Sequence, residues 1–129
     1  MVRTHTVCLD THAIVWAYAG ETEKIGKEAR TLIGHGDLVA SPAAVLELQL
    51  LHEIGRVAPA VATIMDTLAR DIGLRVADER FDLIASAALA ESWTRDPFDR
   101  LIVAHARYLD AVLLTRDRRI TTSYANCRW

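Results

Sequence analysis

The chain has 129 residues, 51% of them hydrophobic, and a formal net charge of -2. This length fits a single domain over residues 1–129, and the composition excludes a disordered chain. The near-neutral charge gives no general attraction to nucleic acid or to membranes, and no apolar run is long enough to span a bilayer. The N-terminal segment, with Arg3 ahead of a strand-like run, is unlike a secretory signal, so we expect a cytoplasmic protein.

In the first part of the chain, short apolar runs typical of buried strands alternate with segments of helical periodicity. Gly20 is expected to end the first helix, and Ser41 followed by Pro42 is typical of a helix start. The predicted elements are a strand over 6–9, helices over 10–19 and 23–33, a strand over 37–40 and a helix over 42–54.

The remaining chain repeats this alternation. The predicted elements are a helix over 59–71, a strand over 74–77, helices over 80–91 and 97–109, a strand over 111–115, a helical turn over 118–123 and an edge strand over 126–129. This order predicts an α/β fold whose central, mostly parallel sheet of four to five strands carries helices on both faces. Ligands bind such sheets beyond the carboxyl ends of the strands.

Several carboxylates stand where apolar segments end or begin. Asp10 closes the first predicted strand, Asp117 follows the strand over 111–115, and Asp96 and Asp99 open a helix that would start on the same rim. Carboxylates brought together there would repel one another without a cation, and clustered hard oxygens suit Mg²⁺ or Mn²⁺. The pattern therefore indicates metal-assisted chemistry on phosphate.

Helix capping is the alternative explanation for most of these acids. Asp10, Asp96 and Asp117 each precede a predicted helix, where an aspartate caps free backbone N–H groups. Asp99, three residues after Asp96, lies on the same helix face and directly before an apolar run. We favour Asp99 as the site residue and Asp96 as the cap, with Asp96 kept as a candidate. Thr115 is placed to orient a carboxylate.

Glu47 interrupts an apolar helix. The helical phase places it with Ala43, Leu50, Leu51 and Ile54, on the side expected to face the core. A buried carboxylate must be paired, protonated or close to a cation. A structural salt bridge to an arginine is the alternative to a metal site.

Arginines gather around the C-terminal acids, and Lys24 and Lys27 are the only lysines in the chain. A planar guanidinium suits phosphate contacts beside a metal site, although arginine-rich codon usage explains the same composition. The arginines concerned are Arg95, Arg100, Arg116, Arg118 and Arg119.

Other polar and aromatic residues are given structural roles. His12, two residues after Asp10 on a predicted helix, is expected to point away from it. Cys8 and Cys127 are expected as free thiols, with a disulfide between chain ends as the alternative. The tryptophans are expected to pack in the core or an interface rather than to stack on bases: Trp16, Trp93 and Trp129.

Four segments in this order and spacing resemble the PIN-domain family, and most closely its VapC-type toxins of bacterial toxin–antitoxin modules. The segments are Leu9-Asp10-Thr11-His12-Ala13, Ser41-Pro42 with Leu46-Glu47, Arg95-Asp96-Pro97-Phe98-Asp99-Arg100-Leu101-Ile102-Val103-Ala104, and Leu114-Thr115-Arg116-Asp117-Arg118-Arg119-Ile120. Together they cover nearly the whole chain.

The resemblance implies a three-layer PIN-like fold and a Mg²⁺- or Mn²⁺-dependent endoribonuclease. It also implies a toxin that a small antitoxin neutralises in a hetero-oligomer, and that is usually a homodimer. Asp10, Glu47, Asp99 and Asp117 match the family's acidic quartet. We expect Asp10 and Asp99 to hold the metal directly, and Glu47 and Asp117 to bind it through water or to hold a second ion.

Substrate positioning is expected from Arg100, Arg116 and Arg118 on the RNA backbone. One alternative is a PIN-like interaction module without activity. The other is a receiver-type phosphoacceptor domain, which would need a lysine at the end of a late strand, whereas Lys24 and Lys27 lie in an early predicted helix.

Overall fold

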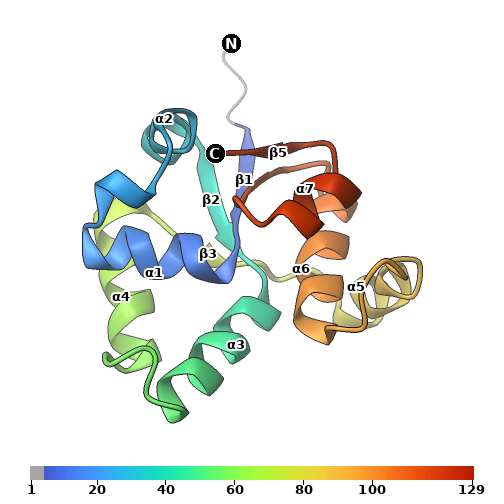
Figure 1. The fold of residues 1–129 in the computed structure, drawn as a ribbon, viewed down its shortest axis with the longest axis horizontal. Helices are drawn as coiled ribbons and strands as arrows, with labels where there is room; N and C mark the ends of the chain where they lie inside the picture. Colours follow the sequence, from blue (N-terminus) through green and yellow to red (C-terminus); the bar gives the residue numbers. More distant parts are fainter. Residues whose placement is uncertain (1–4) are drawn as a thin grey trace.

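The computed structural model describes residues 5–129, so Arg3 lies outside it. Its strands form one five-stranded, all-parallel sheet in the order β3-β2-β1-β4-β5 (Figure 1). The strands are β1 (Thr6–Leu9), β2 (Asp37–Ala40), β3 (Arg75–Val76), β4 (Val112–Leu114) and β5 (Cys127–Arg128). The predicted parallel α/β sheet is therefore confirmed, including the short strands at both edges.

Helices cover both faces of the sheet and make three layers. In Figure 1, α1, α2 and α4 lie on one side of the strands, and α5, α6 and α7 lie on the other. The helices are α1 (Thr11–Ala19), α2 (Lys27–His35), α3 (Pro42–Glu53), α4 (Val61–Ile72), α5 (Phe81–Ala88), α6 (Pro97–Tyr108) and α7 (Arg118–Ser123), with a 3₁₀ turn η1 (Thr22–Lys24). The central strands β1 and β4 are buried, as expected for parallel strands covered on both faces.

One predicted helix is divided in two. The helix expected over 23–33 is η1 followed by α2, because Ile25 is extended and Gly26 forms the N-cap of α2. Ile25 is buried in the core. A side chain at Gly26 would clash with the backbone of Trp129, so this N-cap position has room for glycine alone.

The order of the strands creates a crevice between β1 and β4. From β1 the chain adds β2 and β3 on one side, and later adds β4 and β5 on the other. Leu9 and Leu114, the last residues of β1 and β4, are paired in register, and the Asp10 N–H donates to the Leu114 carbonyl at 3.2 Å. In open parallel sheets this switch of direction is where ligands bind.

The same order argues against a receiver domain, in which the strands follow the order 2-1-3-4-5. Lys24 ends η1 and Lys27 begins α2, so neither follows a late strand of the sheet. Within residues 5–129, no helix has the length and apolar character needed to cross a membrane.

Candidate active site

Asp10 lies at the turn from β1 into α1 and is only 7% exposed. Its Oδ1 accepts a hydrogen bond from the Ala13 N–H at 2.8 Å, so the predicted cap is confirmed. Burial raises the pKa of Asp10 above its usual value, and the nearby Asp117 charge raises it further. Hydrogen bonds from the Thr115 hydroxyl and from Ala13 oppose that rise in pKa. The Asp10 carboxylate therefore both caps α1 and lies close to another negative charge.

Asp117 occupies the equivalent turn from β4 into α7. Its Oδ1 accepts from the Arg119 N–H at 2.9 Å, and its own N–H donates to the Thr115 Oγ1 at 3.1 Å. Thr115 is 1% exposed. Thr115 thus accepts a hydrogen bond from Asp117 through its hydroxyl oxygen and lies close enough to Asp10 to counter the rise in the pKa of that acid. The sequence predicted that Thr115 orients a carboxylate, and the hydrogen bond to the backbone of Asp117 agrees with that role.

Asp96 and Asp99 differ in their surroundings, although they share the first turn of α6. Asp96 is the N-cap, with Oδ1 accepting from the N–H groups of Phe98 at 2.8 Å and Asp99 at 3.3 Å. The Asp99 carboxylate makes no cap. Burial, followed by the negative charges of Asp96, Glu47 and Asp117, raises the pKa of Asp99 to about 7. Asp99 is therefore the acid at which the crowding of charge is greatest.

Glu47 projects from α3 and is partly buried, and its Oε1 accepts a hydrogen bond from the Thr11 hydroxyl. The expected core-facing stripe is confirmed at Ala43 and Leu51, which are buried or packed against the core. It is wrong at Leu50 and Ile54, which are 42% and 66% exposed. α3 extends away from the sheet toward its C-terminus, so the residues it buries are near its start and at Leu48 (Figure 1). Among the residues that the structure describes, no arginine pairs with Glu47.

One recess brings all five carboxylates together. Its lining is Asp10, Thr11, His12, Glu47, Asp96, Asp99, Ile102, Asp117, Arg119 and Ile120. These residues come from α1, α3, α6 and α7 and from the turns that follow β1 and β4, so the recess lies at the crevice between those two strands.

The donor set is made of hard carboxylate oxygens, which is the chemistry that Mg²⁺ and Mn²⁺ prefer. Excess negative charge is already evident in the raised pKa values of Asp10 and Asp99. Across residues 5–129, no three ligating side chains stand close enough to form a complete metal site. Mg²⁺ commonly keeps several waters and takes one or two carboxylates, so the recess fits such an ion without a closed cage.

Thr94 and Arg119 are site residues that the sequence did not single out in these roles. Thr94 is 3% exposed, and its Oγ1 accepts from the Asp96 N–H at 3.1 Å and from Arg119 Nη2 at 3.0 Å. Its carbonyl accepts from Arg100 Nε at 2.7 Å. Arg119 lies in the recess and lowers the pKa of Asp99, partly opposing the acids. Thr94 therefore connects the loop before α6 to α7.

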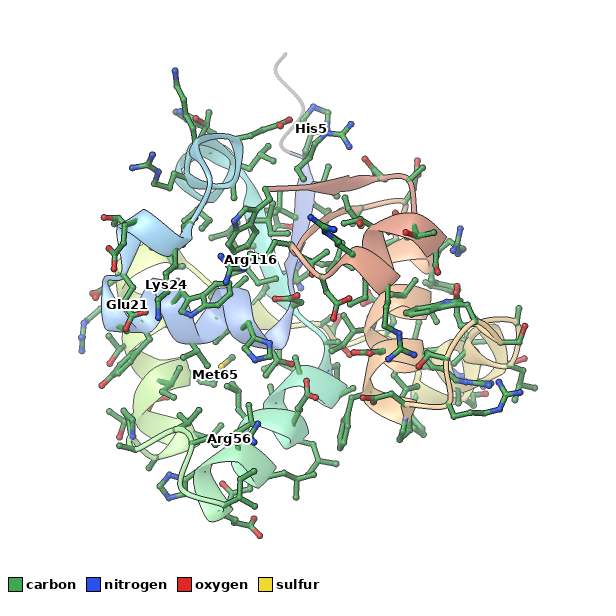
Figure 2. All side chains as sticks on the ribbon, in the orientation of Figure 1. His5, Glu21, Lys24, Arg56, Met65 and Arg116 are labelled. Atoms are coloured by element: carbon green, nitrogen blue, oxygen red, sulfur yellow. The ribbon has the colours of Figure 1, made fainter. Side chains whose placement is uncertain are left out.

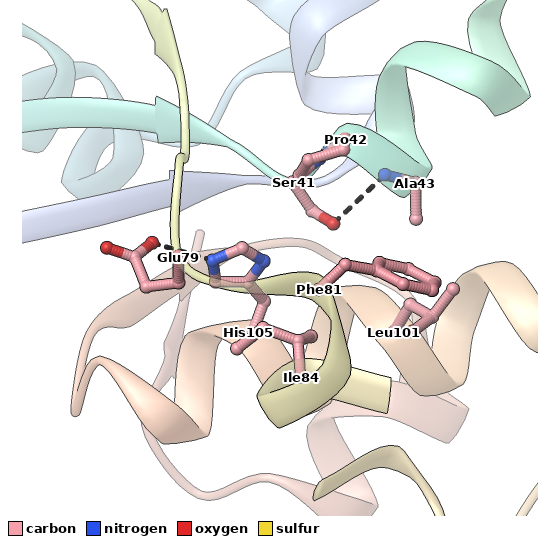
Figure 3. A pocket seen from close by; sticks show the side chains of 8 residues that line it. All are labelled: Ser41, Pro42, Ala43, Glu79, Phe81, Ile84, Leu101 and His105. Carbon is pink, nitrogen blue, oxygen red and sulfur yellow. Dashed lines mark hydrogen bonds and ion pairs between the residues drawn. The ribbon is translucent and has the colours of Figure 1, made fainter. Parts of the chain in front are cut away.

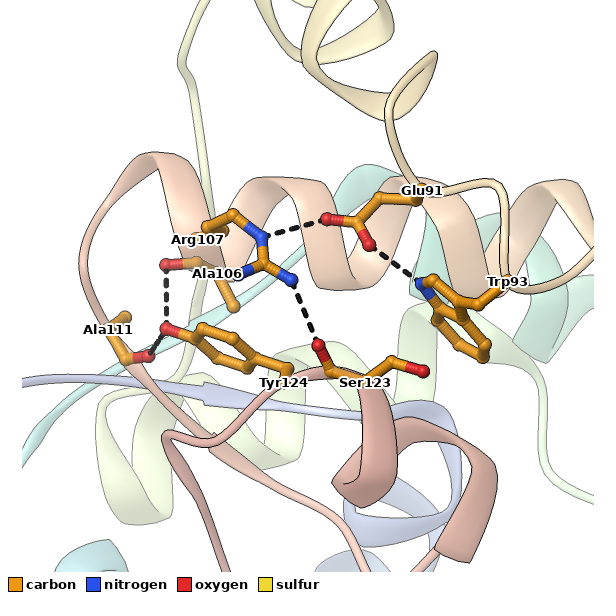
Figure 4. A network of polar contacts seen from close by, with 7 residues as sticks. All are labelled: Glu91, Trp93, Ala106, Arg107, Ala111, Ser123 and Tyr124. Atoms are coloured by element: carbon orange, nitrogen blue, oxygen red, sulfur yellow. Dashed lines mark hydrogen bonds and ion pairs between the residues drawn. The ribbon is translucent and has the colours of Figure 1, made fainter.

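A network of polar contacts around the buried Glu91 also supports this loop (Figure 4). Glu91 is 4% exposed and accepts from Trp93 Nε1 at 2.7 Å and from Arg107 Nε at 2.9 Å. Arg107 also donates to the Ser123 carbonyl at 3.2 Å and lies over the Tyr124 ring. The loop that carries Thr94 and the helix that carries Arg119 are thus joined by two separate sets of hydrogen bonds.

His12, Trp16 and Arg116 lie beside the acids. The prediction that His12 points away is wrong: it is exposed, lines the acidic recess and opposes the raised pKa of Asp10. Trp16 packs edge-on against Trp129 at 5.5 Å between ring centroids and lies partly buried against the core, which leaves one side of it at the recess. His12 and Trp16 are one turn apart on α1, so both side chains lie on the same side of the helix, at the rim of the recess.

The remaining candidates are placed as follows. Arg118 is exposed and Arg100 is partly buried, and neither side chain lines the recess. Cys8 and Cys127 are free, as predicted, and burial raises the pKa of Cys8 to about 12.

A second, small cavity lies between the start of α3 and the α5–α6 pair (Figure 3). His105, 2% exposed, contacts Glu79 Oε1 through Nε2 at 2.8 Å. The other lining residues are Ser41, Pro42, Ala43, Phe81, Ile84 and Leu101. Its single carboxylate and histidine are already paired, so this cavity lacks the ligand set of the acidic recess.

The chain belongs to the PIN-domain family, whose model matches residues 7–124. It is 34% identical over 119 residues to ribonuclease VapC22 of Mycobacterium tuberculosis (strain ATCC 25618 / H37Rv), with 89% of each chain covered. The crystal structure of VapBC2 from Rickettsia felis bound to a DNA fragment from their promoter contains a similar fold. That likeness has a TM-score of 0.68 at 15% identity and covers 96% of this chain and 98% of the other. The resemblance read from the sequence is therefore confirmed.

Proposed function

We propose that this chain is the VapC-type toxin of a toxin–antitoxin module and acts as a metal-dependent endoribonuclease. The observation that carries the proposal is the convergence of five carboxylates on one recess, two of them with raised pKa values. Such a cluster is costly unless it serves a cation, and the similar Mycobacterium tuberculosis protein is named a ribonuclease. The reaction is the hydrolysis of an RNA phosphodiester bond.

Asp10 and Asp99 are the residues that would hold Mg²⁺ or Mn²⁺ directly, because burial and repulsion disfavour their charged forms most strongly. Glu47 and Asp117 would bind the ion through water or hold a second one. When bound, the ion supplies Lewis-acid polarisation of a phosphate oxygen and lowers the pKa of a water molecule. Asp96, already fixed as a cap, supports the site through its charge and keeps Asp99 crowded.

The protein's own groups hold the reactants. Carboxylate oxygens that are not engaged in caps accept hydrogen bonds from the attacking water and take up its proton. Arg119 at the recess, with Arg100, Arg116 and Arg118 around it, would position the RNA backbone. Thr115 keeps Asp10 and Asp117 in place, so that little reorganisation is needed during the reaction.

The proposed partners are a cognate small antitoxin and a second copy of the chain, and the proposed location is the cytoplasm. Large apolar side chains exposed along α3 support protein contacts, since such stripes are typical of interfaces. They are Leu46, Leu50 and Ile54. The described residues share one sheet and one continuous core, which supports a single PIN domain over the chain.

An interaction module without activity is the second candidate. A module that only binds partners has no use for five carboxylates held in one recess at a cost in stability. The two candidates differ in RNA cleavage, which is directly measurable.

The test uses purified protein freed of metal with EDTA and mixed with RNA extracted from the cells of origin. We expect cleavage after Mg²⁺ or Mn²⁺ is added back, new RNA ends at discrete positions, and loss of cleavage when the protein of the adjoining reading frame is present. Intact RNA in the presence of either metal, from protein shown to be folded, would contradict the proposal and favour the interaction module.

A further inference from the structure

A second recess opens beside the acidic one. It is lined by Asp10, His12, Trp16, Arg116 and Asp117, so it shares two carboxylates with the proposed catalytic site. Those two acids form one wall, and an aromatic and cationic surface forms the other. A molecule whose phosphate lies over the acids would therefore place its neighbouring group against Trp16 and Arg116.

Arg116 and Trp16 form a layered pair. The guanidinium carbon of Arg116 lies 4.6 Å from the centroid of the Trp16 ring, the spacing of a cation–π contact. Trp129 packs edge-on against the same indole and holds it in place. In the part of the chain that the structure describes, the Arg116 guanidinium makes no hydrogen bond or ion pair. The pair is thus held by stacking while the Arg116 donors stay available.

His12, Lys24 and Arg56 extend this surface, and Lys24 is also paired with Glu21 at 2.8 Å. The His12 ring lies 5.7 Å from Trp16 and borders both the acidic recess and the second one. Beyond His12 and Trp16, an adjoining hollow is lined by Lys24 and Arg56 among others, and Figure 2 shows these labelled side chains around α1 on the same face as Arg116. Aromatic rings interleaved with cations are typical of surfaces that bind single-stranded nucleic acid.

We propose that the Arg116–Trp16 pair, with His12 at its edge, is a stacking subsite for an unpaired nucleobase next to the phosphodiester that is cut. This inference rests on the proposed ribonuclease function and deepens it, because it specifies single-stranded RNA as the substrate. A base inside a duplex keeps its faces stacked on its neighbours, whereas a base in a loop can be turned out onto a guanidinium or aromatic plane.

The subsite also explains how the substrate is held over excess negative charge. The recess repels a phosphate until a cation is present, so RNA needs contacts outside it. Stacking a base on the Arg116 plane brings no phosphate over the acids. Arg116 lines the same recess as Asp10 and Asp117, so its guanidinium can meet a neighbouring phosphate.

The test measures binding of short unstructured oligoribonucleotides by fluorescence anisotropy in an Asp10→Asn background, which blocks turnover. Arg116→Ala and Trp16→Leu should each weaken binding about tenfold, and the double variant should be little worse than either single variant. Arg30→Ala is the matched control, because Arg30 is an exposed arginine of α2 outside both recesses and has no proposed role in RNA binding. Its loss should be smaller and should disappear at high salt.

RNA with a single abasic ribose moved along the strand decides whether the contact is with a base. At one position the abasic RNA should bind the parent protein about tenfold more weakly and should bind the Arg116→Ala variant without further loss. Equal losses for both proteins at every abasic position would overturn the subsite. So would unchanged RNA affinity in both variants combined with weaker binding of the antitoxin, which would assign the surface to a protein partner.

Failure of the subsite and failure of the proposed function give different results. Cleavage by the unmodified chain without any abasic coupling overturns the subsite alone, and absence of cleavage overturns the ribonuclease proposal. Arg116 is exposed, so Arg116→Ala keeps the test decisive even if Trp16→Leu impairs folding.

Discussion

The hydroxyl group of Thr11 donates a hydrogen bond to the carboxylate of Glu47, a residue 36 positions away on another helix. Thr11 begins α1 and directly follows Asp10, and it is only 2% exposed. The contact therefore joins Glu47 of α3 to the residue that directly follows Asp10. It fixes one wall of the recess without any charged partner for Glu47.

Thr11→Val tests that contact, because valine keeps the shape of threonine and removes the hydroxyl. We expect kcat/KM for RNA cleavage to fall about tenfold and stability to fall by about 1 kcal/mol, since Glu47 loses a partly buried partner. Kinetics and thermal unfolding measure the two effects. Thr63→Val on the exposed side of α4 is the matched control and should change neither. Full activity in Thr11→Val would show that the contact does not position Glu47.

The raised pKa of Asp99 makes the metal-free protein sensitive to pH. The folded-state pKa of about 7 lies above the ordinary value of 3.8, so the folded form binds the proton more tightly. The contribution of Asp99 to the free energy of unfolding is fully present below pH 3.8 and is lost as the pH rises through about 7. In EDTA, Asp99→Asn should raise the melting temperature at about pH 8 and leave it unchanged at about pH 4. An equal rise in melting temperature at both pH values would show that the Asp99 charge is not the cause of the destabilisation.

Divalent cations should remove the same repulsion. Adding Mg²⁺ or Mn²⁺ to the metal-free protein at neutral pH is expected to raise its melting temperature in a concentration-dependent way, because the ion binds the folded state alone. The rise should be much smaller in Asp99→Asn. Thermal unfolding against metal concentration measures both, with Ca²⁺ and NaCl at matched ionic strength as references. An identical rise in the variant would place the ion elsewhere.

The pair of Glu79 and His105 should give the opposite pH dependence. The hydrogen bond with His105 lowers the pKa of Glu79 below 4.5, so its stabilisation is present above that value and is lost as pH falls through the folded-state pKa. Glu79→Gln should cost about 1 kcal/mol at neutral pH and nothing in strong acid. Urea unfolding across pH measures this. RNA cleavage should be retained, because the pair lies outside the acidic recess.

The sheet and most of the site were predictable because both follow from local patterns. Apolar runs marked the strands, and Asp10 and Asp117 were placed by the rule that parallel strands present their carboxyl ends at one edge. Asp99 was separated from Asp96 by the apolar run behind it. Each of these inferences needs only the residues next to the acid.

The parts that failed depend on contacts between distant segments. Helical periodicity predicted that Leu50 and Ile54 face the core, but it contains no information on where α3 leaves the sheet. The close approach at Gly26 involves Trp129, which lies more than a hundred residues later in the sequence. His12 was dismissed from its spacing to Asp10 alone, whereas the rim that it joins includes Arg116, more than a hundred residues later in the sequence.

The central claim is that the carboxylates act in metal-dependent RNA cleavage, and Asp10→Asn tests it most directly. Asparagine caps α1 as well as aspartate does, so the fold should be preserved while the charge is lost. Asp66→Asn, an exposed acid of α4 outside the recess, is the matched control. With Mg²⁺ or Mn²⁺ present, we expect cleavage to be lost in Asp10→Asn and retained in Asp66→Asn. Undiminished cleavage by folded Asp10→Asn would contradict the account.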